Sequence, residues 1–207
     1  MKLKTTLMTG AAAIMALATA AHAERGTDGQ VNILYSQAIS TMNGYMSGGT
    51  KDIEAGSLVL EPLAGFDEKG NIIPRLVTEI PSKENGGISE DLTSITWKIK
   101  PDLKWSDGTD FTAEDVKFTA DYCMDESGGC AQAAKFTGIA SVEVVDPLTV
   151  RLKTNGPSPL LPANLANIFI VSRSVAANSS TADFNSGKAA IGTGPYKFVS
   201  YDPNNRV

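Results

Sequence analysis

Residues 95–153 contain a strand pattern, a capped helix and a hairpin in that order, and this order constrains the fold more than any other feature of the sequence. Residues 95–100 alternate between apolar and polar side chains, which is typical of a half-buried strand. Residues 112–115 have the Thr-x-x-Asp spacing of a capping box, which predicts that a helix begins there. Residues 142–153 contain two apolar segments around an Asp-Pro turn, which indicates a β-hairpin. These patterns predict a domain of mixed helices and strands.

The first 23 residues have the features of a cleavable export signal. Lys2 and Lys4 give a positive start, residues 7–18 are apolar, and Ala21-His22-Ala23 fits the small-x-small cleavage pattern. We expect cleavage after Ala23; the alternative is an amphipathic or buried N-terminal helix. Cleavage would remove the only histidine and two lysines, which lowers the net charge from -5 to -7. An acidic exported chain is a poor candidate for binding nucleic acid, so we expect no nucleic-acid partner.

The two cysteines indicate an oxidising compartment. Cys123 and Cys130 are separated by six residues that include Gly128-Gly129. A pair joined by so short a loop is most simply a local disulfide. The alternatives are a redox pair, which favours C-x-x-C, and a zinc site, for which further Cys or His ligands are lacking. A lipid-anchored exported protein needs a cysteine directly after the cleavage point, and neither cysteine stands there. We therefore expect a free periplasmic protein.

Weaker patterns predict further short elements along the chain. They are a buried strand over Val31–Tyr35, a helix over residues 52–63, a turn over residues 67–71, a helix that begins after Ser172 or Ser174, and a last strand over Tyr196–Tyr201.

Several blocks of sequence together resemble one known family. The main blocks are ITWKI at 95–99, WSDGT at 105–109, FTAEDV at 111–116 and GTGPY at 192–196. In this order they look like the solute-binding proteins of ABC importers, in the family 5 class that includes dipeptide, oligopeptide and nickel binders. LEPL at 60–63, the turn at 70–74 and the Asp146-Pro147 hairpin match in order as well.

The resemblance implies an α/β, periplasmic-binding-protein-like fold of type II, with two lobes and a hinge in the full protein. Members of this class are much longer than 207 residues, so we expect this chain to be an N-terminal fragment with only the first lobe and its inserted subdomain. The expected divisions are a signal peptide at 1–23, the start of the first lobe's main sheet at 24–48, an inserted α+β subdomain at 49–175, and a return to the main sheet at 176–207.

The resemblance also implies a function. Such proteins close two lobes over a solute in the periplasm and deliver it to the membrane permease of an ABC transporter. An oligopeptide or dipeptide is the first expectation, and an opine, an oligosaccharide or a nickel complex is an alternative. We expect no cofactor, no bound metal and no enzymatic activity. In the peptide binders the missing lobe supplies much of the charged contact to the ligand, so this chain alone is expected to bind poorly.

Candidate ligand contacts lie in loops that follow strands, because strand ends open into the cleft between the lobes. Thr41, Asn43 and Tyr45 offer a hydroxyl, an amide and an aromatic ring in one glycine-containing loop, and the matching loop lines the cleft in this family. Gln132 and Phe136, just after the cysteine pair, are further candidates. The alternative is that these residues belong to solvated loops.

Other conspicuous residues have simpler explanations. Trp97 and Trp105 could stack on a ligand, but their positions favour core packing. Gly192-Thr193-Gly194 lacks the third glycine and the lysine of a phosphate-binding loop. The acidic residues Asp107, Asp110, Glu114 and Asp115 fit turn and capping roles.

Two other classes of function remain as alternatives. One is a secreted hydrolase that uses a pair of carboxylates, since the absence of histidine from the mature chain removes Ser-His and Cys-His mechanisms. The other is an envelope protein with no role in transport.

Overall fold

The computed structural model describes residue 29 and residues 31–125, 127, 129–202 and 205–207. The predicted signal peptide, residues 1–23, lies outside this part of the chain. The chain divides into two compact units, residues 1–34 and residues 35–207. All the helices and strands described belong to the second unit.

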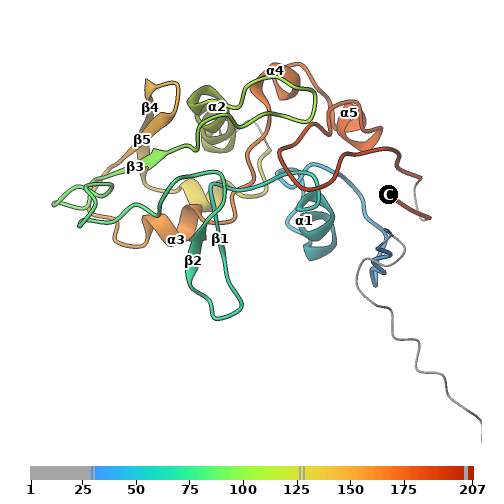
Figure 1. Cartoon of the computed structure of the whole chain (residues 1–207), viewed down its shortest axis with the longest axis horizontal. Helices are drawn as coiled ribbons and strands as arrows, with labels where there is room; N and C mark the ends of the chain where they lie inside the picture. Colours follow the sequence, from blue (N-terminus) through green and yellow to red (C-terminus); the bar gives the residue numbers. More distant parts are fainter. Residues whose placement is uncertain (1–28, 30, 126, 128, 203–204) are drawn as a thin grey trace, which may run out of the picture. The chain divides into compact units, whose positions relative to one another are not determined.

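Short helices and strands alternate along the second unit (Figure 1). In chain order they are α1 (Thr50–Gly56), β1 (Ala64–Phe66), β2 (Ile72–Pro74), β3 (Ser94–Lys98), α2 (Ala113–Met124), the 3-10 helix η1 (Ala133–Phe136), β4 (Ile139–Asp146), β5 (Thr149–Thr154), α3 (Leu161–Leu165), α4 (Arg173–Ala176) and α5 (Thr181–Asn185). None of the helices within the described ranges is long and apolar enough to cross a membrane.

The largest sheet has three antiparallel strands in the order β3-β5-β4. Trp97 on β3 lies opposite Val150 on β5, and Val142 on β4 lies opposite Leu152. These four side chains are buried on one face of the sheet. The predicted strand and the predicted hairpin are therefore confirmed, because apolar residues at alternate positions of the paired strands reach the core, whereas Leu148 in the turn is exposed.

Helix α2 begins at the predicted capping box. The N–H of Thr112 donates to the Asp115 carboxylate at 2.9 Å, which satisfies a backbone group that the first turn leaves free. Val116, Ala120 and Cys123 lie on the buried face of the helix, and α2 packs against β4 and β5.

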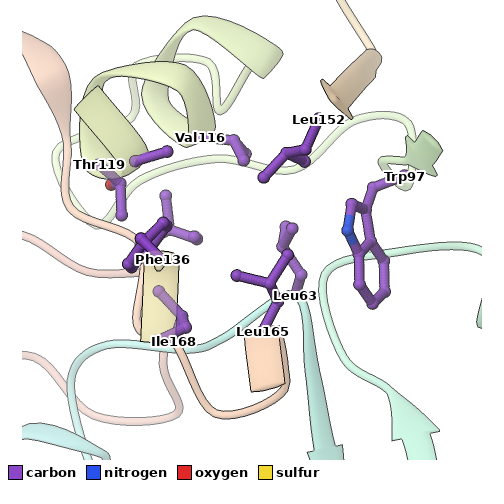
Figure 2. Close-up of a pocket in the computed structure, with 10 residues that line it drawn as sticks. Leu63, Trp97, Val116, Thr119, Phe136, Leu152, Leu165 and Ile168 are labelled. Carbon is purple, nitrogen blue, oxygen red and sulfur yellow. The ribbon is translucent and has the colours of Figure 1, made fainter. Parts of the chain in front are cut away.

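Side chains from distant parts of the sequence meet in the core beneath the sheet. A cavity of about 20 Å³ remains among them. Figure 2 shows Leu63, Trp97, Val116, Phe136 and Leu165 around this cavity. Since its lining is almost wholly apolar, the cavity is a packing defect of the core and offers few partners to a polar ligand.

The turn predicted at residues 67–71 joins β1 and β2 into a two-stranded hairpin. The Asp67 carboxylate accepts the N–H groups of Lys69 at 2.9 Å and Asn71 at 2.8 Å. Gly70 has φ of 81°, a conformation that costs little only for glycine. The turn is confirmed. The strands β1 and β2 were not predicted, because three residues are too few to show an alternation of apolar and polar side chains.

The helix predicted over residues 52–63 is wrong in its extent. Helix α1 ends at Gly56. Beyond it, the Val59 carbonyl accepts the N–H of Gly194, and Pro62 forms an isolated bridge with Phe169. Val59 and Leu63 are buried, but by contacts with distant segments and not by a common helical face.

The two strands predicted nearest the ends of the mature chain are also wrong. Neither Val31–Tyr35 nor Tyr196–Tyr201 belongs to any ladder of the described chain. A strand persists only where a neighbouring strand pairs with its N–H and C=O groups, whatever its apolar content.

Candidate functional site

Residues 40–46 fold back on themselves through the polar side chains that the sequence singled out. The Thr41 hydroxyl accepts the N–H of Asn43 at 3.0 Å, and the Asn43 side-chain oxygen accepts the N–H of Tyr45 at 2.9 Å. All three side chains are buried. Because Thr and Asn side chains bond readily to backbone groups two residues on, they satisfy this segment without a strand ladder.

A buried carboxylate anchors the start of this segment. Asp52 on α1 is fully buried and accepts the N–H of Ser40 at 2.7 Å and its hydroxyl at 2.9 Å, while the Lys51 ammonium lies 2.9 Å away. Burial alone would raise the pKa of this carboxyl, but hydrogen bonds from Ser47, Lys51 and Ser40 hold the pKa far below its usual value. Asp52 therefore remains charged and fixes the loop to α1.

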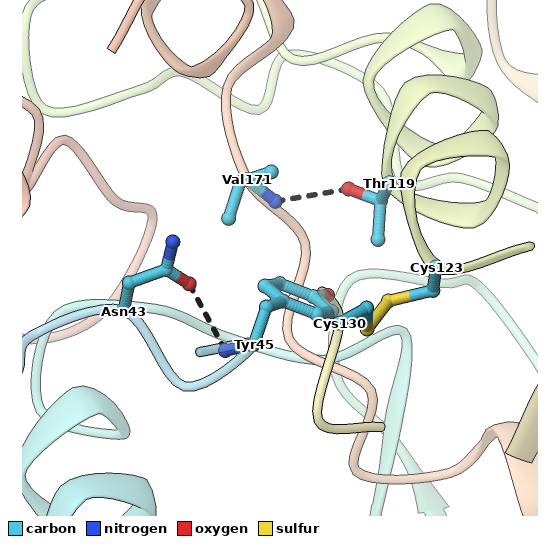
Figure 3. The surroundings of a disulfide bond; sticks show 6 residues. All are labelled: Asn43, Tyr45, Thr119, Cys123, Cys130 and Val171. Atoms are coloured by element: carbon cyan, nitrogen blue, oxygen red, sulfur yellow. Dashed lines mark hydrogen bonds between the residues drawn. A yellow bond between two sulfur atoms is a disulfide. The ribbon is translucent and has the colours of Figure 1, made fainter. Parts of the chain in front are cut away.

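The Tyr45 ring lies beside the disulfide bond (Figure 3). It meets the Tyr122 ring edge-on, with ring centroids 6.2 Å apart and planes at 87°. The Tyr45 carbonyl accepts the N–H of Ala131 at 2.5 Å. Burial raises the pKa of the Tyr45 phenol well above its usual value, an effect that the Thr119 hydroxyl only partly offsets. Tyr45 is therefore neutral and serves as a fixed aromatic wall.

Cys123 and Cys130 form the predicted disulfide, with their Cα atoms 5.0 Å apart. Cys123 lies in the last turn of α2, and Cys130 directly precedes Ala131, whose N–H binds the Tyr45 carbonyl. The disulfide therefore connects α2 to the backbone that holds Tyr45 (Figure 3).

A second cavity, of about 50 Å³, adjoins Tyr45. Its walls come from the loop at 43–46, from α2 and from residues 171–184. The lining residues are Asn43, Tyr45, Met46, Phe118, Tyr122, Val171, Ala176, Ser179 and Phe184. Concave, mostly apolar surfaces with a few polar groups are the usual binding places of small molecules. This cavity is therefore the candidate site.

The structure brings only some of the predicted ligand contacts together. Asn43 and Tyr45 line the cavity, and Thr41 lies behind them in the same hydrogen-bonded loop. Gln132 is half-buried directly before η1. Phe136 is buried in the core and lines the other, apolar cavity (Figure 2), so it does not contribute to this site.

Four large side chains at the cavity were not singled out from the sequence. Phe118 and Tyr122 are four residues apart on α2, and this spacing places both on one helix face. Their aromatic pairing was a signal that the sequence offered. Met46 and Phe184 carried no such signal, because their contribution depends on contacts between distant segments.

The acidic residues near α2 have the structural roles expected of them. Asp107 accepts the N–H of Thr109 at 2.9 Å within a turn. Asp115 caps α2 and accepts the indole N–H of the buried Trp105 at 3.3 Å. Within the ranges that the structure describes, no three His, Cys, Asp or Glu side chains gather as a metal site requires.

Residues 71–207 match the family described as bacterial extracellular solute-binding proteins, family 5 Middle. A protein of Brucella ovis named as an ABC transporter peptide-binding protein is 34% identical over 146 residues, which are 68% of this chain and 26% of the relative. The glutathione-binding protein GsiB of Pectobacterium atrosepticum is 31% identical over 145 residues, which are 70% of this chain and 27% of the relative. The chain therefore spans about a quarter of the length of these curated relatives.

Solved structures resemble the chain over most of its length. NikZ from Campylobacter jejuni, in complex with Ni(L-His), has a TM-score of 0.68 and 27% identity over 79% of this chain and 31% of its own. OppA from Haemophilus influenzae, in complex with the peptide RPPGFSPFR, has a TM-score of 0.71 and 18% identity over 81% of this chain and 35% of its own. At 18% identity the second likeness concerns the fold alone.

Proposed function

Because this chain belongs to the bacterial extracellular solute-binding proteins of family 5, we propose that it is part of the binding component of an ABC importer. This component would capture a peptide-like solute in the periplasm and deliver it to a membrane permease. The observation that carries the proposal is the family match over residues 71–207. The fold agrees with it, since the described chain has part of the type II periplasmic-binding-protein architecture.

A peptide-like solute is favoured by what the relatives bind. One is named for peptides and another for glutathione, which is itself a tripeptide. Both are more than 30% identical to this chain, whereas the structure with nickel-histidine is 27% identical. We therefore place an oligopeptide or dipeptide before a metal complex.

We assign the solute contact of this part of the protein to the cavity beside Tyr45. Asn43 supplies an amide and Tyr45 a rigid aromatic wall, and both are held by bonds within their own loop. Thr41 would support the Asn43 contact from behind, through its hydrogen bond to the Asn43 N–H. Pre-formed walls favour binding because little conformational entropy is lost when the solute enters.

We further propose that residues 24–48 and 176–207 belong together in the first lobe, with residues 49–175 inserted between them. Contacts at the two ends of the second unit support this division. Met42 and Ala190 belong to one small apolar cluster, which also contains Ala55 and Val59 from the first residues of the inserted segment. The Tyr201 hydroxyl donates to the Ile39 carbonyl.

Mass spectrometry of the protein purified from the periplasm of its own cells tests the proposal. We expect a native complex that releases a peptide-sized molecule on denaturation, and a chain that lacks residues 1–23. Two results together would contradict the proposal: the purified protein carries no solute, and none of the peptides added to it raises its melting temperature. A ligand that binds only the native state must stabilise that state.

A further inference from the structure

The cavity beside Tyr45 has walls without formal charge. Its two polar side chains besides the tyrosines are Asn43 and Ser179, and the others are aromatic, aliphatic or thioether groups. An ionised group of a ligand would lose its hydration there without gaining a partner of opposite charge. The cavity therefore disfavours a charged side chain.

Charged residues on and beside the adjoining elements form two ion pairs. Lys117 lies 2.7 Å from Asp121 on α2, and Lys188 lies 3.1 Å from Asp183 at α5. Arg173 at the start of α4 is exposed and does not line the cavity. Because these four side chains neutralise one another, the two ion pairs supply no free charge to the walls of the cavity.

The size of the cavity limits its occupant. A volume of about 50 Å³ exceeds the roughly 10–15 Å³ that one water molecule requires. It is far smaller than the roughly 300–1,000 Å³ of a pocket that encloses a whole drug-sized ligand. The cavity can therefore receive one short side chain but not an entire solute.

The walls are rigid as well as neutral. Tyr45 is held through its carbonyl by Ala131, and the Cys123–Cys130 bond connects that backbone to the end of α2, which carries Tyr122 (Figure 3). One backbone hydrogen bond and one disulfide thus connect the Tyr45 wall of the cavity to the Tyr122 wall. A cavity that cannot widen easily discriminates by size.

We propose that this cavity is a specificity pocket for one uncharged aliphatic side chain of the solute, of valine or leucine size. The inference rests on the proposed function, since it presupposes a peptide-like solute. It adds that the pocket accepts apolar side chains at one position of the peptide and rejects Asp, Glu and Lys there.

Calorimetry with a set of tripeptides tests this inference on the protein purified from its own cells. The set is Ala-Ala-Ala with single leucine, aspartate or lysine substitutions at each position. At one position we expect leucine to bind about tenfold tighter than alanine, and the two charged residues to bind more weakly than alanine. Binding of the whole set with no preference at any position would overturn the specificity pocket and leave the proposed function intact. Binding of none would overturn both.

A matched pair of variants on one helix end locates the pocket. Ala176 lines the cavity, whereas the next residue, Ala177, is exposed. In Ala176→Leu the new side chain would occupy the cavity, so the tenfold leucine preference should disappear. Ala177→Leu should retain the preference. A full leucine preference in an Ala176→Leu protein that keeps the circular dichroism spectrum and melting temperature of the unaltered protein would overturn the assignment. The peptide set on the unaltered protein does not depend on the folding of either variant.

Discussion

The region at residues 94–154 and the region formed by residues 35–60 with 186–202 are held together by different means. In the first, β3, β5 and β4 pair along their length, and α2 covers their apolar face. In the second, the described residues form no ladder, and single backbone contacts join segments far apart in sequence. The first region is stabilised by many interchangeable contacts, and the second by a few specific ones.

The glycines near the C-terminal end illustrate the second kind of stability. Gly192 and Gly194 pass so close to Val59 that an added Cβ on either would overlap its backbone. Gly194 donates its N–H to the Val59 carbonyl at 2.8 Å, and Ser106 donates its N–H to the Gly192 carbonyl at 2.9 Å. The Gly-Thr-Gly segment is therefore a site of close backbone packing.

Removing the largest buried side chain of the paired region should have the largest effect. Trp97 is fully buried against Val150 and the core. Trp97→Ala should lower the free energy of unfolding by about 3–5 kcal/mol, because it leaves a cavity that the strands cannot fill. Urea unfolding measures the change. The neighbouring exposed variant Lys98→Ala should cost less than about 1 kcal/mol, and equal losses in the two variants would contradict this account.

The Asp52 carboxylate should matter most in the other region. Asp52→Asn replaces one of the two acceptor oxygens of the Ser40 groups by an NH2 donor and leaves Lys51 without its charged partner, so we expect a loss of roughly 3 kcal/mol at pH 7. The exposed Asp121→Asn is the control and should cost about 0.5 kcal/mol. Urea unfolding of both variants checks the difference.

The same carboxylate predicts a dependence on acid. Because the pKa of Asp52 is lower in the folded than in the unfolded state, its stabilising contribution is complete above about pH 5 and is lost as the pH falls below about 4. The stability of the unaltered protein should therefore fall more steeply between pH 5 and pH 3 than that of Asp52→Asn. Parallel slopes would show that Asp52 does not carry this charge interaction.

The disulfide lies in the first region, next to the Ala131 N–H that binds the Tyr45 carbonyl of the second, so its loss should affect both regions. Replacing both cysteines by serine should cost roughly 2–3 kcal/mol. Hydrogen exchange should become faster at Ala131 and in residues 40–46, while the β1–β2 hairpin remains unchanged. Uniformly faster exchange would mean that the bond stabilises the whole fold and does not specifically position Tyr45.

Gly192→Ala should cause the smallest of these losses of stability. Its overlap with Val59 forces the backbones apart, at a cost of about 1–3 kcal/mol. Gly48→Ala in the same region is the control, because its Cβ would meet no atom within 4 Å. Thermal unfolding that lowers the melting temperature equally in both variants would refute the close packing as the cause.

The difference between the regions also explains what the sequence could predict. The strand at 95–99, the capped helix at 112, the hairpin at 142–153 and the disulfide depend on patterns within a few residues, and all are confirmed. The end of α1 and the unpaired segments at 31–35 and 196–201 depend on partners elsewhere in the chain. The local patterns there predicted a longer helix and two strands, and these predictions were wrong.

The candidate site could be predicted from the sequence only in part. Asn43 and Tyr45 were recognisable because side chains of different chemistry were concentrated in one short loop. The opposite wall was not recognisable as such, since Val171 and Phe184 lie about 50 residues or more beyond α2 in the sequence and reach the cavity only through tertiary packing. Local sequence thus identified one wall, and tertiary contacts supplied the rest.

Hydrogen exchange of the protein with and without a leucine-containing tripeptide tests directly whether the solute binds in the cavity beside Tyr45. We expect the peptide to slow exchange in residues 41–46, in the last two turns of α2 and in residues 171–184. Exchange in the β1–β2 hairpin, which does not line the cavity, should not change. Saturable binding that protects other segments and leaves these three unchanged would show that the solute site lies elsewhere in the protein.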